Sequence, residues 1–141
     1  MAKRDIKTIQ GGYDAFAKGD VDSVLAVMDS RVSWNEPSTL PWGAGRTSGP
    51  KAVATKVFAE ALKLFPDLKV KPESFESAGD TVLVRGTFTG TGKGGKFKAP
   101  FAHVWTMKNG KAAKFQNYTD TAAINAAIGG AGRRGLPRGG P

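Results

Sequence analysis

Apolar residues recur at helical spacing in three stretches of the first half of the chain. Residues 5–18 and 21–28 each carry one apolar side, and they predict two consecutive amphipathic helices. A short strand is expected at residues 31–35, followed by a Pro- and Gly-rich loop without periodicity. The third helix is predicted to begin near Pro50, which suits the first turn of a helix, and to end before Pro66.

In the second half of the chain the apolar positions alternate, which predicts strands. The segment "DLKVKPESFES" is an imperfect strand, in which Pro72 marks an edge or a bulge. The next strand, "TVLVRGTFTG", places Val82, Val84 and Phe88 on one face. These three side chains are therefore candidates for the wall of an apolar interior.

Two further strands, "FKAPFAHVWTMK" and "KAAKFQNYTD", are joined by "NG", the strongest short signal for a hairpin. A two-residue loop pairs Lys108 with Lys111 and, if there is no bulge, Ala102 with Asn117. A bulge would exchange the faces of the two strands. The face predicted to be inside carries Ala102, Val104, Thr106, Ala113, Phe115 and Asn117. The outer face carries Phe101, His103, Trp105, Met107, Lys114, Gln116 and Tyr118.

A last short helix is expected after Asp120, which completes an α+β fold with helices on one face of a long antiparallel sheet. The chain has 141 residues, 40% of them hydrophobic and 23% charged, as in one soluble globular domain. It has no apolar run long enough to cross a membrane, and "MAKRDIKTI" at its start is charged. We therefore expect a cytoplasmic protein without a membrane segment.

Cysteine is absent and His103 is the single histidine. These counts exclude disulfides, a cysteine nucleophile and a zinc site built from several histidines. We expect no metal and no cofactor.

The net charge of +9 raises the question of a nucleic-acid partner. Part of this charge lies in residues 129–141, "GGAGRRGLPRGGP", whose composition is typical of a disordered tail. The other basic residues are not interleaved with aromatic ones, as a platform for single strands would require. Nucleic-acid binding is therefore disfavoured, and the domain is assigned to residues 1–128.

Glu36 in "VSWNEPS" is the main candidate for chemistry. It follows a strand directly, and Pro37 favours extended geometry at the residue before it, so Glu36 is expected at the rim of the sheet. A carboxylate in this place is either a solvated loop charge or an acid–base group aimed into a cavity. The local pattern alone leaves both alternatives open.

Four segments in order resemble the SnoaL-like branch of the nuclear-transport-factor-2-like superfamily, which includes ketosteroid isomerases and limonene-epoxide hydrolases. The segments are "YDAFAKGDVDSVLAVM", "VSWNEP", "SGPKAV" and "FAHVWTMKNGKAAKFQNYTDTAAI". The resemblance implies a cone, in which a strongly curved sheet wraps around three helices and leaves an apolar pocket open at one end. It also implies a homodimer through the outer face of the sheet, as in most members.

Only some of the functional residues of these families have counterparts in this chain. In ketosteroid isomerases the general base is an aspartate in an "EDP"-like step, and "NEP" places Glu36 at that position. Their protonated aspartate falls on Ala102, and their helix tyrosine falls on Gly12 or, with a gap, on Tyr13. The second catalytic aspartate of limonene-epoxide hydrolases falls on Asn117, and their catalytic arginine falls near Gly86, so this chain has neither residue. The resemblance therefore implies a base without its usual partners.

Cyclases of the SnoaL type use a histidine and an aspartate on this hairpin, which would correspond to His103 and Asp120. In the predicted register the two residues are about 13 Å apart, too far for a catalytic pair. We therefore expect His103 on the outer face at a dimer interface and Asp120 as a helix cap. The apolar Phe101, Trp105 and Met107 on the same outer face also favour a homodimer.

The sequence thus predicts a pocket for a small apolar molecule. One hypothesis is a cofactor-independent isomerase, cyclase or hydratase that acts on a carbonyl compound by general-base chemistry. The alternative is a non-catalytic module that binds a ligand or serves in assembly. The predicted catalytic residues are Glu36, Asn117 and Tyr13, and the predicted ligand-contacting residues are Trp34, Val82, Val84, Phe88, Ala102, Val104 and Phe115.

Overall fold

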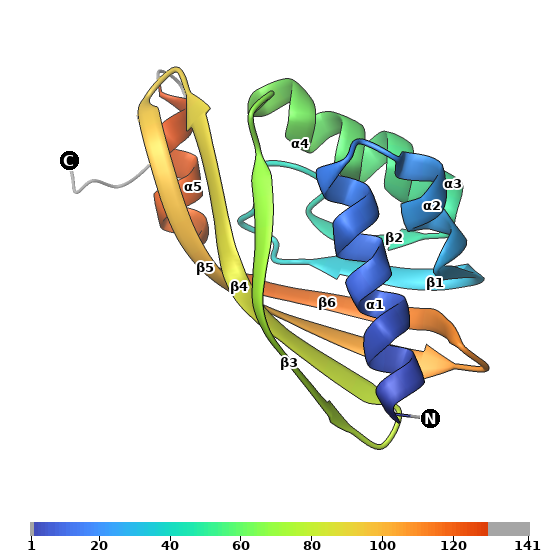
Figure 1. Ribbon diagram of the computed structural model, residues 1–141. Coiled ribbons are helices and arrows are strands. Elements are labelled where there is room, and N and C mark those ends of the chain that lie inside the picture. The colour runs from blue at the N-terminus through green and yellow to red at the C-terminus, as the bar shows by residue number, and fades with distance from the viewer. Residues whose placement is uncertain (1, 130–141) are drawn as a thin grey trace.

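Six strands form one sheet in the order β2-β1-β6-β5-β4-β3 in the computed structural model, which describes residues 2–129. Neighbouring strands are antiparallel except β1 and β6, which are parallel, a pairing that the sequence did not predict. The long strands β4 and β5 bend strongly, so that the sheet curves around the helices (Figure 1). The strands are β1 (Met28–Glu36), β2 (Gly45–Ser48), β3 (Lys69–Ala78), β4 (Thr81–Gly92), β5 (Gly95–Lys108) and β6 (Lys111–Thr119).

The helices before β3 cover the concave face of the sheet, and α5 packs at the far end of β4 and β5 (Figure 1). This arrangement confirms the predicted α+β fold with three N-terminal helices and a short C-terminal one. The third helix is a continuous run of α3, a π-helical turn η1, and α4. The bounds are α1 (Ala2–Ala17), α2 (Val21–Ala26), α3 (Pro50–Val53), η1 (Ala54–Phe58), α4 (Ala59–Leu64) and α5 (Thr121–Ile128).

The helices begin and end at residues that favour helix ends: glycine, capping aspartate and proline. Gly19 takes the left-handed conformation after α1, and the Asp20 carboxylate caps α2 by accepting from the Ser23 backbone N–H. Pro50 occupies the first turn of α3 as predicted, and α4 ends at Leu64, shortly before Pro66. These local signals place the helices correctly, and packing decides which side faces the sheet.

The predicted register of the β5–β6 hairpin is wrong beyond Met107. Lys108 pairs with Lys111 and Met107 with Ala112, but Thr106 pairs with Lys114, so that Ala113 is an extra residue in β6. This bulge shifts every later pair by one residue. Because side chains alternate along a strand, the shift exchanges the two faces of β5 relative to β6.

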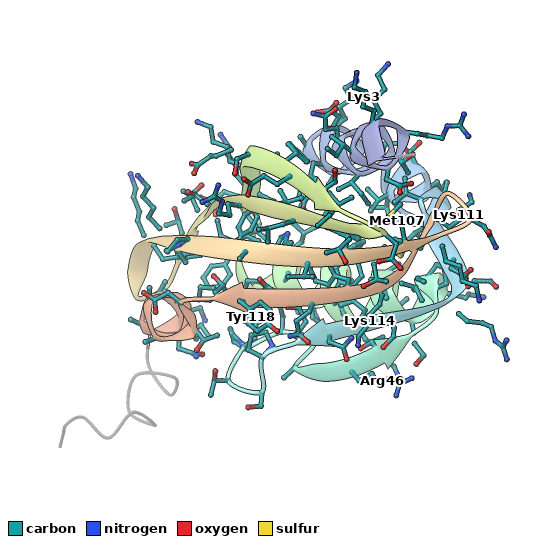
Figure 2. All side chains as sticks on the ribbon, turned by 90° about the horizontal axis from the view of Figure 1, so that it is seen from below. Lys3, Arg46, Met107, Lys111, Lys114 and Tyr118 are labelled. Carbon is teal, nitrogen blue, oxygen red and sulfur yellow. The ribbon has the colours of Figure 1, made fainter. Side chains whose placement is uncertain are left out.

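Ala102 and Val104 therefore lie on the outer face of the sheet, where both are half-buried, and they are not pocket residues. The inward residues of β5 are instead Phe101, His103, Trp105 and Met107, none of which is more than 5% exposed. Residues such as Lys114 and Tyr118 occupy the outer face, which Figure 2 shows from below. The homodimer stays a prediction, but it loses the outer apolar side chains that favoured it.

No helix among residues 2–129 is long and apolar enough to cross a membrane. The predicted disordered tail lies outside the described residues, except for Gly129.

Candidate functional site

A row of three inward polar side chains crosses β5, β6 and β1. His103 of β5 pairs directly with Asn117 of β6, and the parallel register of β6 and β1 brings Asn117 beside Glu36. The Asn117 Nδ2 atom donates a hydrogen bond of 2.8 Å to Glu36 Oε1. All three residues are buried, and Asn117 is only 1% exposed. The sheet thus gathers residues 36, 103 and 117 in one place.

An aromatic row runs alongside the polar one on the same three strands. Trp105 pairs with Phe115 across β5 and β6, and Phe115 stacks on Trp34 of β1 with ring centroids 3.8 Å apart. These rings and the helices enclose a cavity of about 80 Å³, measured as the space open to the centres of water-sized molecules. One water occupies roughly 10–15 Å³ on this measure, so the cavity has room for a small organic molecule.

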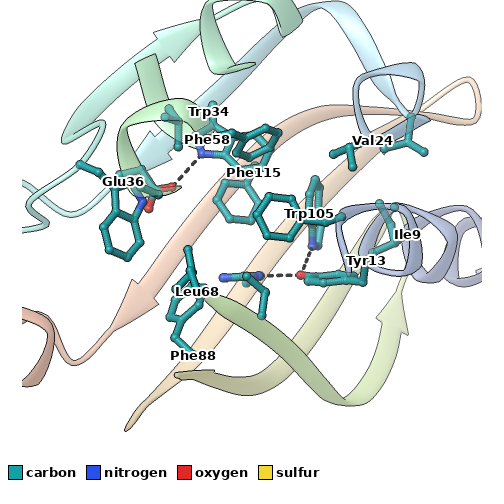
Figure 3. Close-up of a pocket in the computed structure, with 18 residues that line it drawn as sticks. Ile9, Tyr13, Val24, Trp34, Glu36, Phe58, Leu68, Phe88, Trp105 and Phe115 are labelled. Carbon is teal, nitrogen blue, oxygen red and sulfur yellow. Dashed lines mark hydrogen bonds between the residues drawn. The ribbon is translucent and has the colours of Figure 1, made fainter. Parts of the chain in front are cut away.

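The cavity is apolar on almost every side (Figure 3). Its titratable side chains among the described residues are Tyr13, Glu36 and His103, while α2, the η1–α4 helix, β3 and β4 contribute only apolar groups to its wall. All three tryptophans of the chain line it. The wall consists of Ile9, Gly12, Tyr13, Phe16, Val24, Val27, Trp34, Glu36, Trp42, Val57, Phe58, Ala61, Leu68, Val70, Phe88, His103, Trp105 and Phe115.

Two N–H donors hold the Glu36 carboxyl at the end of β1. Asn117 binds one oxygen, and the Trp34 indole N–H donates to Oε2 at 2.8 Å. Glu36 is 7% exposed, and burial raises its pKa from 4.5 to about 7, although both hydrogen bonds act in the opposite direction. Because this value lies close to neutral pH, the carboxyl can both take up and release a proton under ordinary conditions. Of the two alternatives for Glu36, the buried acid–base group matches this geometry.

A second polar cluster joins α1 to β5. The hydroxyl of Tyr13 lies 2.6 Å from His103 Nδ1 and accepts a hydrogen bond of 3.1 Å from the Trp105 indole N–H. Burial lowers the pKa of His103 to about 3, which keeps the ring neutral, and burial also raises the pKa of Tyr13. The prediction that His103 lies on the outer face is therefore wrong.

The other predicted residues divide into two groups. Trp34, Phe88 and Phe115 line the cavity, as expected. Val82 and Val84 are buried on the inner face of β4, but they pack in the core without lining the cavity.

Several wall residues could not be identified from the sequence pattern. Trp42 lies in the loop between β1 and β2, where no periodicity signals its burial. His103 and Trp105 were assigned to the outer face because the predicted register lacked the bulge. Val57 and Phe58, by contrast, lie on the apolar side of the predicted third helix, and both line the cavity from the π-helical turn.

Asp120 does not take part in the site. Its carboxylate accepts from the Ala123 backbone N–H at 3.1 Å and caps α5, as expected. Within residues 2–129, no group of three or more histidine, cysteine or acidic side chains is arranged to hold a metal ion.

Comparisons with known proteins match this architecture. The family model of the SnoaL-like domain matches residues 9–115, and the chain therefore belongs to the SnoaL-like family, within the nuclear-transport-factor-2-like superfamily. No curated protein sequence matches the chain.

Solved structures extend the similarity to about nine-tenths of the chain. A nuclear-transport-factor-2-like protein of unknown function from Burkholderia pseudomallei is 28% identical, with a TM-score of 0.83 over 90% of this chain and 98% of that one. TerC, co-crystallised with polyporic acid, is 27% identical, with a TM-score of 0.81 over 89% and 98%. A structure from Jannaschia sp. CCS1, described as a SnoaL-like polyketide cyclase, is 20% identical over 89% and 92%, with a TM-score of 0.76, and it is similar in fold alone.

Proposed function

We propose that this protein is a cofactor-independent enzyme that moves a proton next to the carbonyl group of a small, mostly apolar molecule. Glu36 is the general base in this proposal. Its carboxylate takes a proton from the carbon beside the carbonyl, which leaves an enolate, and the resulting carboxylic acid returns the proton to the same or another carbon. Isomerisation and ring closure can both begin with this step.

The observation that carries the proposal is a single ionisable carboxyl in an apolar cavity, with a pKa raised to about 7. A carboxylate with its ordinary pKa is a weak base, whereas burial makes Glu36 a stronger one while its two N–H donors hold its orientation. Catalytic acids and bases need a pKa near the pH at which they work, so a buried carboxyl of this kind in a cavity is a candidate functional group.

The arrangement also limits the expected rate. An enolate is stabilised best by hydrogen-bond donors aimed at its oxygen. Asn117 and Tyr13, two of the predicted catalytic residues, carry such donors. However, an Asn117 amide N–H is bound to Glu36, and the Tyr13 hydroxyl is bound to His103. Asn117 therefore orients the base in this proposal. We expect modest rates, because these two donors are already bound and are not aimed at the charge that develops on the substrate oxygen.

One of the similar structures supports a small-molecule substrate. TerC was co-crystallised with polyporic acid, and its identity to this chain is 27%. The Jannaschia structure described as a SnoaL-like polyketide cyclase is similar in fold alone, so it carries no argument for ring-forming chemistry. An aromatic compound with an enolisable carbonyl group suits the rings of Trp34, Trp105 and Phe115.

A non-catalytic binding module is the second candidate. The observation that favours it is that several donors of the site are already bound by other protein groups. These donors are the indole N–H groups of Trp34 and Trp105, the Tyr13 hydroxyl and one N–H of Asn117. In this alternative, the protonated carboxyl of Glu36 donates a hydrogen bond to a ligand oxygen and no bond is broken.

Deuterium exchange separates the two candidates. The probe is 2-tetralone, an enolisable aromatic ketone, followed in D₂O by the loss of its α-proton signal in the NMR spectrum. We expect the protein to accelerate exchange, and kcat/KM to rise with pH until it levels off above about pH 7, because the carboxylate is the active form of Glu36. Tryptophan fluorescence reports binding in the same samples, since all three tryptophans line the cavity. Quenching without exchange would favour the binding module. The absence of both quenching and exchange would reject this ligand class for both candidates.

Gly12 provides a test of where the ligand binds. Gly12 lies in the middle of α1 and lines the cavity, and an added Cβ would meet only the Val27 side chain, at 3.5 Å. The neighbouring Gly11 is exposed, with no atom within 4 Å of an added Cβ. Neither has a positive φ, so a larger residue fits the helical backbone at both positions.

We expect Gly12→Leu to weaken the binding of 2-tetralone by about tenfold or more, because its side chain fills the cavity. Gly11→Leu is the matched control and should leave binding unchanged. Both substitutions remove a helix-interior glycine, which should raise the stability of each variant by roughly 0.5–1 kcal/mol. Fluorescence titration and thermal unfolding measure the two effects. Equal binding by both variants would show that the ligand does not occupy this cavity.

A further inference from the structure

Two buried polar atoms have no hydrogen-bond partner within the part of the chain that the structure describes, His103 Nε2 and Asn117 Oδ1. They belong to residues that pair directly across β5 and β6, and both side chains point into the interior. Side chains of such pairs lie within reach of each other. An unpaired buried polar atom costs roughly 1–3 kcal/mol, so two of them in one pair call for a physical account.

Hydrogen bonds on the far side of His103 determine which of its nitrogens carries the proton. The indole N–H of Trp105 can only donate, so the Tyr13 oxygen is the acceptor in that bond. The proton of the Tyr13 hydroxyl is then directed to His103 Nδ1, 2.6 Å away. The neutral ring consequently carries its own proton on Nε2, the unpaired atom. The ring is also held in place by Phe101, which stacks on it with centroids 3.8 Å apart.

The bond to Glu36 determines which way the Asn117 amide points. Its Nδ2 atom donates to Glu36 Oε1, so the carbonyl oxygen Oδ1 is at the other end of the amide. The atoms left over are therefore a donor, the Nε2–H of His103, and an acceptor, the Oδ1 of Asn117. The Asn117 side chain also acts on His103 in the direction that raises the pKa of the ring, as an acceptor facing its N–H would.

We propose that His103 is a positioning residue, whose Nε2–H faces Asn117 Oδ1 and so keeps the amide N–H of Asn117 directed at Glu36. This inference rests on the proposed role of Glu36 as the working group of the pocket. Trp105, Tyr13, His103 and Asn117 then form a series of hydrogen bonds that ends at the Glu36 carboxylate. Each member of this series donates to the next. A side chain on α1 thereby influences an acid–base group at the end of β1.

A reversed amide would have the opposite effect on Glu36. If the proton of His103 moved to Nδ1, its Nε2 would become an acceptor, and Asn117 would turn its N–H toward the ring. Its carbonyl would then face Glu36, where it repels a carboxylate and accepts from a carboxylic acid. Glu36 would hold its proton to a higher pH. Within residues 2–129, the other titratable groups of the pocket wall are Tyr13 and His103, which both belong to the series, so no further ionisable group from this range complicates the comparison.

The test is a titration of Glu36 by NMR in protein that carries ¹³C-labelled glutamate, with the Glu36 signal assigned by its loss in Glu36→Gln. Tyr13→Phe removes the group that directs the histidine proton to Nε2, and His103→Leu removes the donor itself. We expect both to raise the midpoint of the Glu36 titration by about one pH unit. His103→Gln is the conservative control, because its amide can accept from Tyr13 and donate to Asn117, and it should restore the wild-type midpoint.

Midpoints that are unchanged in Tyr13→Phe and His103→Leu would overturn the inference. An equal rise in all three variants would also overturn it, because a merely structural role of the ring predicts no rescue by glutamine. If one of the first two variants does not fold, the other still tests the same step. The readout needs no turnover, so an inactive protein whose Glu36 midpoint responds as expected would contradict the proposed function and leave this inference standing.

Discussion

Replacing Glu36 with glutamine is expected to slow deuterium exchange into 2-tetralone by about 10²–10⁴-fold, the usual contribution of a positioned general base. Glutamine has nearly the same shape as glutamate, but it cannot take a proton from carbon. The measurement is the NMR exchange rate above pH 7, where the wild-type carboxyl is deprotonated. Ligand quenching of tryptophan fluorescence should persist in the variant, because the apolar wall is unchanged.

Glu60→Gln is the matched control for this prediction. Glu60 lies on α4 with its side chain 49% exposed, in an ion pair with Lys63 on the surface. The same chemical change there should leave the exchange rate at the wild-type value. If Glu36→Gln also exchanges at the wild-type rate, the general base is not Glu36, and the binding module becomes the better description.

The second large effect concerns the pH dependence of stability, to which Glu36 and His103 contribute with opposite signs. The pKa of Glu36 rises from 4.5 in the unfolded chain to about 7 on folding, so between these values the folded state holds a proton that the unfolded state has lost. Stability from this group therefore falls as the pH rises through that window. The pKa of His103 falls from 6.5 to about 3, so here the unfolded state holds the extra proton, and stability rises with pH.

The two contributions should cancel between about pH 4.5 and 6.5, the window they share. Each single variant removes one of them and exposes the other. We expect the free energy of unfolding of Glu36→Gln to rise by about 1.4 kcal/mol per pH unit relative to wild type, and that of His103→Gln to fall by a similar amount. Between pH 4.5 and 6.5, the free energy of unfolding of each variant changes by about 3 kcal/mol relative to that of the wild type.

Urea unfolding at several pH values measures these slopes. Comparing slopes rather than absolute stabilities removes the direct cost of each substitution, including any lost hydrogen bond. The exposed Asp20 and Asp67, whose hydrogen bonds lower their pKa, contribute equally to all three proteins. Three parallel curves would mean that neither pocket group has its pKa shifted in the way we describe.

Sequence patterns predicted the elements that depend on local signals. The helix that starts at Pro50, the capping by Asp20 and Asp120, and the inward face of β4 all follow from periodicity and from residues with strong positional preferences. Glu36 was identifiable for a similar reason, because Pro37 directly after a strand places it at a strand end. That it is buried among aromatic rings is a matter of tertiary packing.

The parts of the site that could not be predicted depend on one residue of register or on chain segments far apart in sequence. Nothing in "KNGKAAKF" shows that Ala113 is extruded from the ladder, and alternation then assigns His103 to the wrong face. The pairing of β1 with β6 brings together residues 36 and 117, and no periodicity within either strand encodes it. The hydrogen bond between Tyr13 and His103 joins positions 90 residues apart.

The extra residue in β6 also bears on how pockets of this kind diverge during evolution. A point mutation alters one wall position, whereas loss of the codon for Ala113 would require β5 or the remainder of β6 to turn its other face inward. Ala102 and Val104 could then replace His103 and Trp105 in the cavity in a single genetic event. The helices and β4 would keep their sequences, so a deletion at this bulge that turns β5 over would exchange the polar His103 of the cavity wall for an apolar side chain.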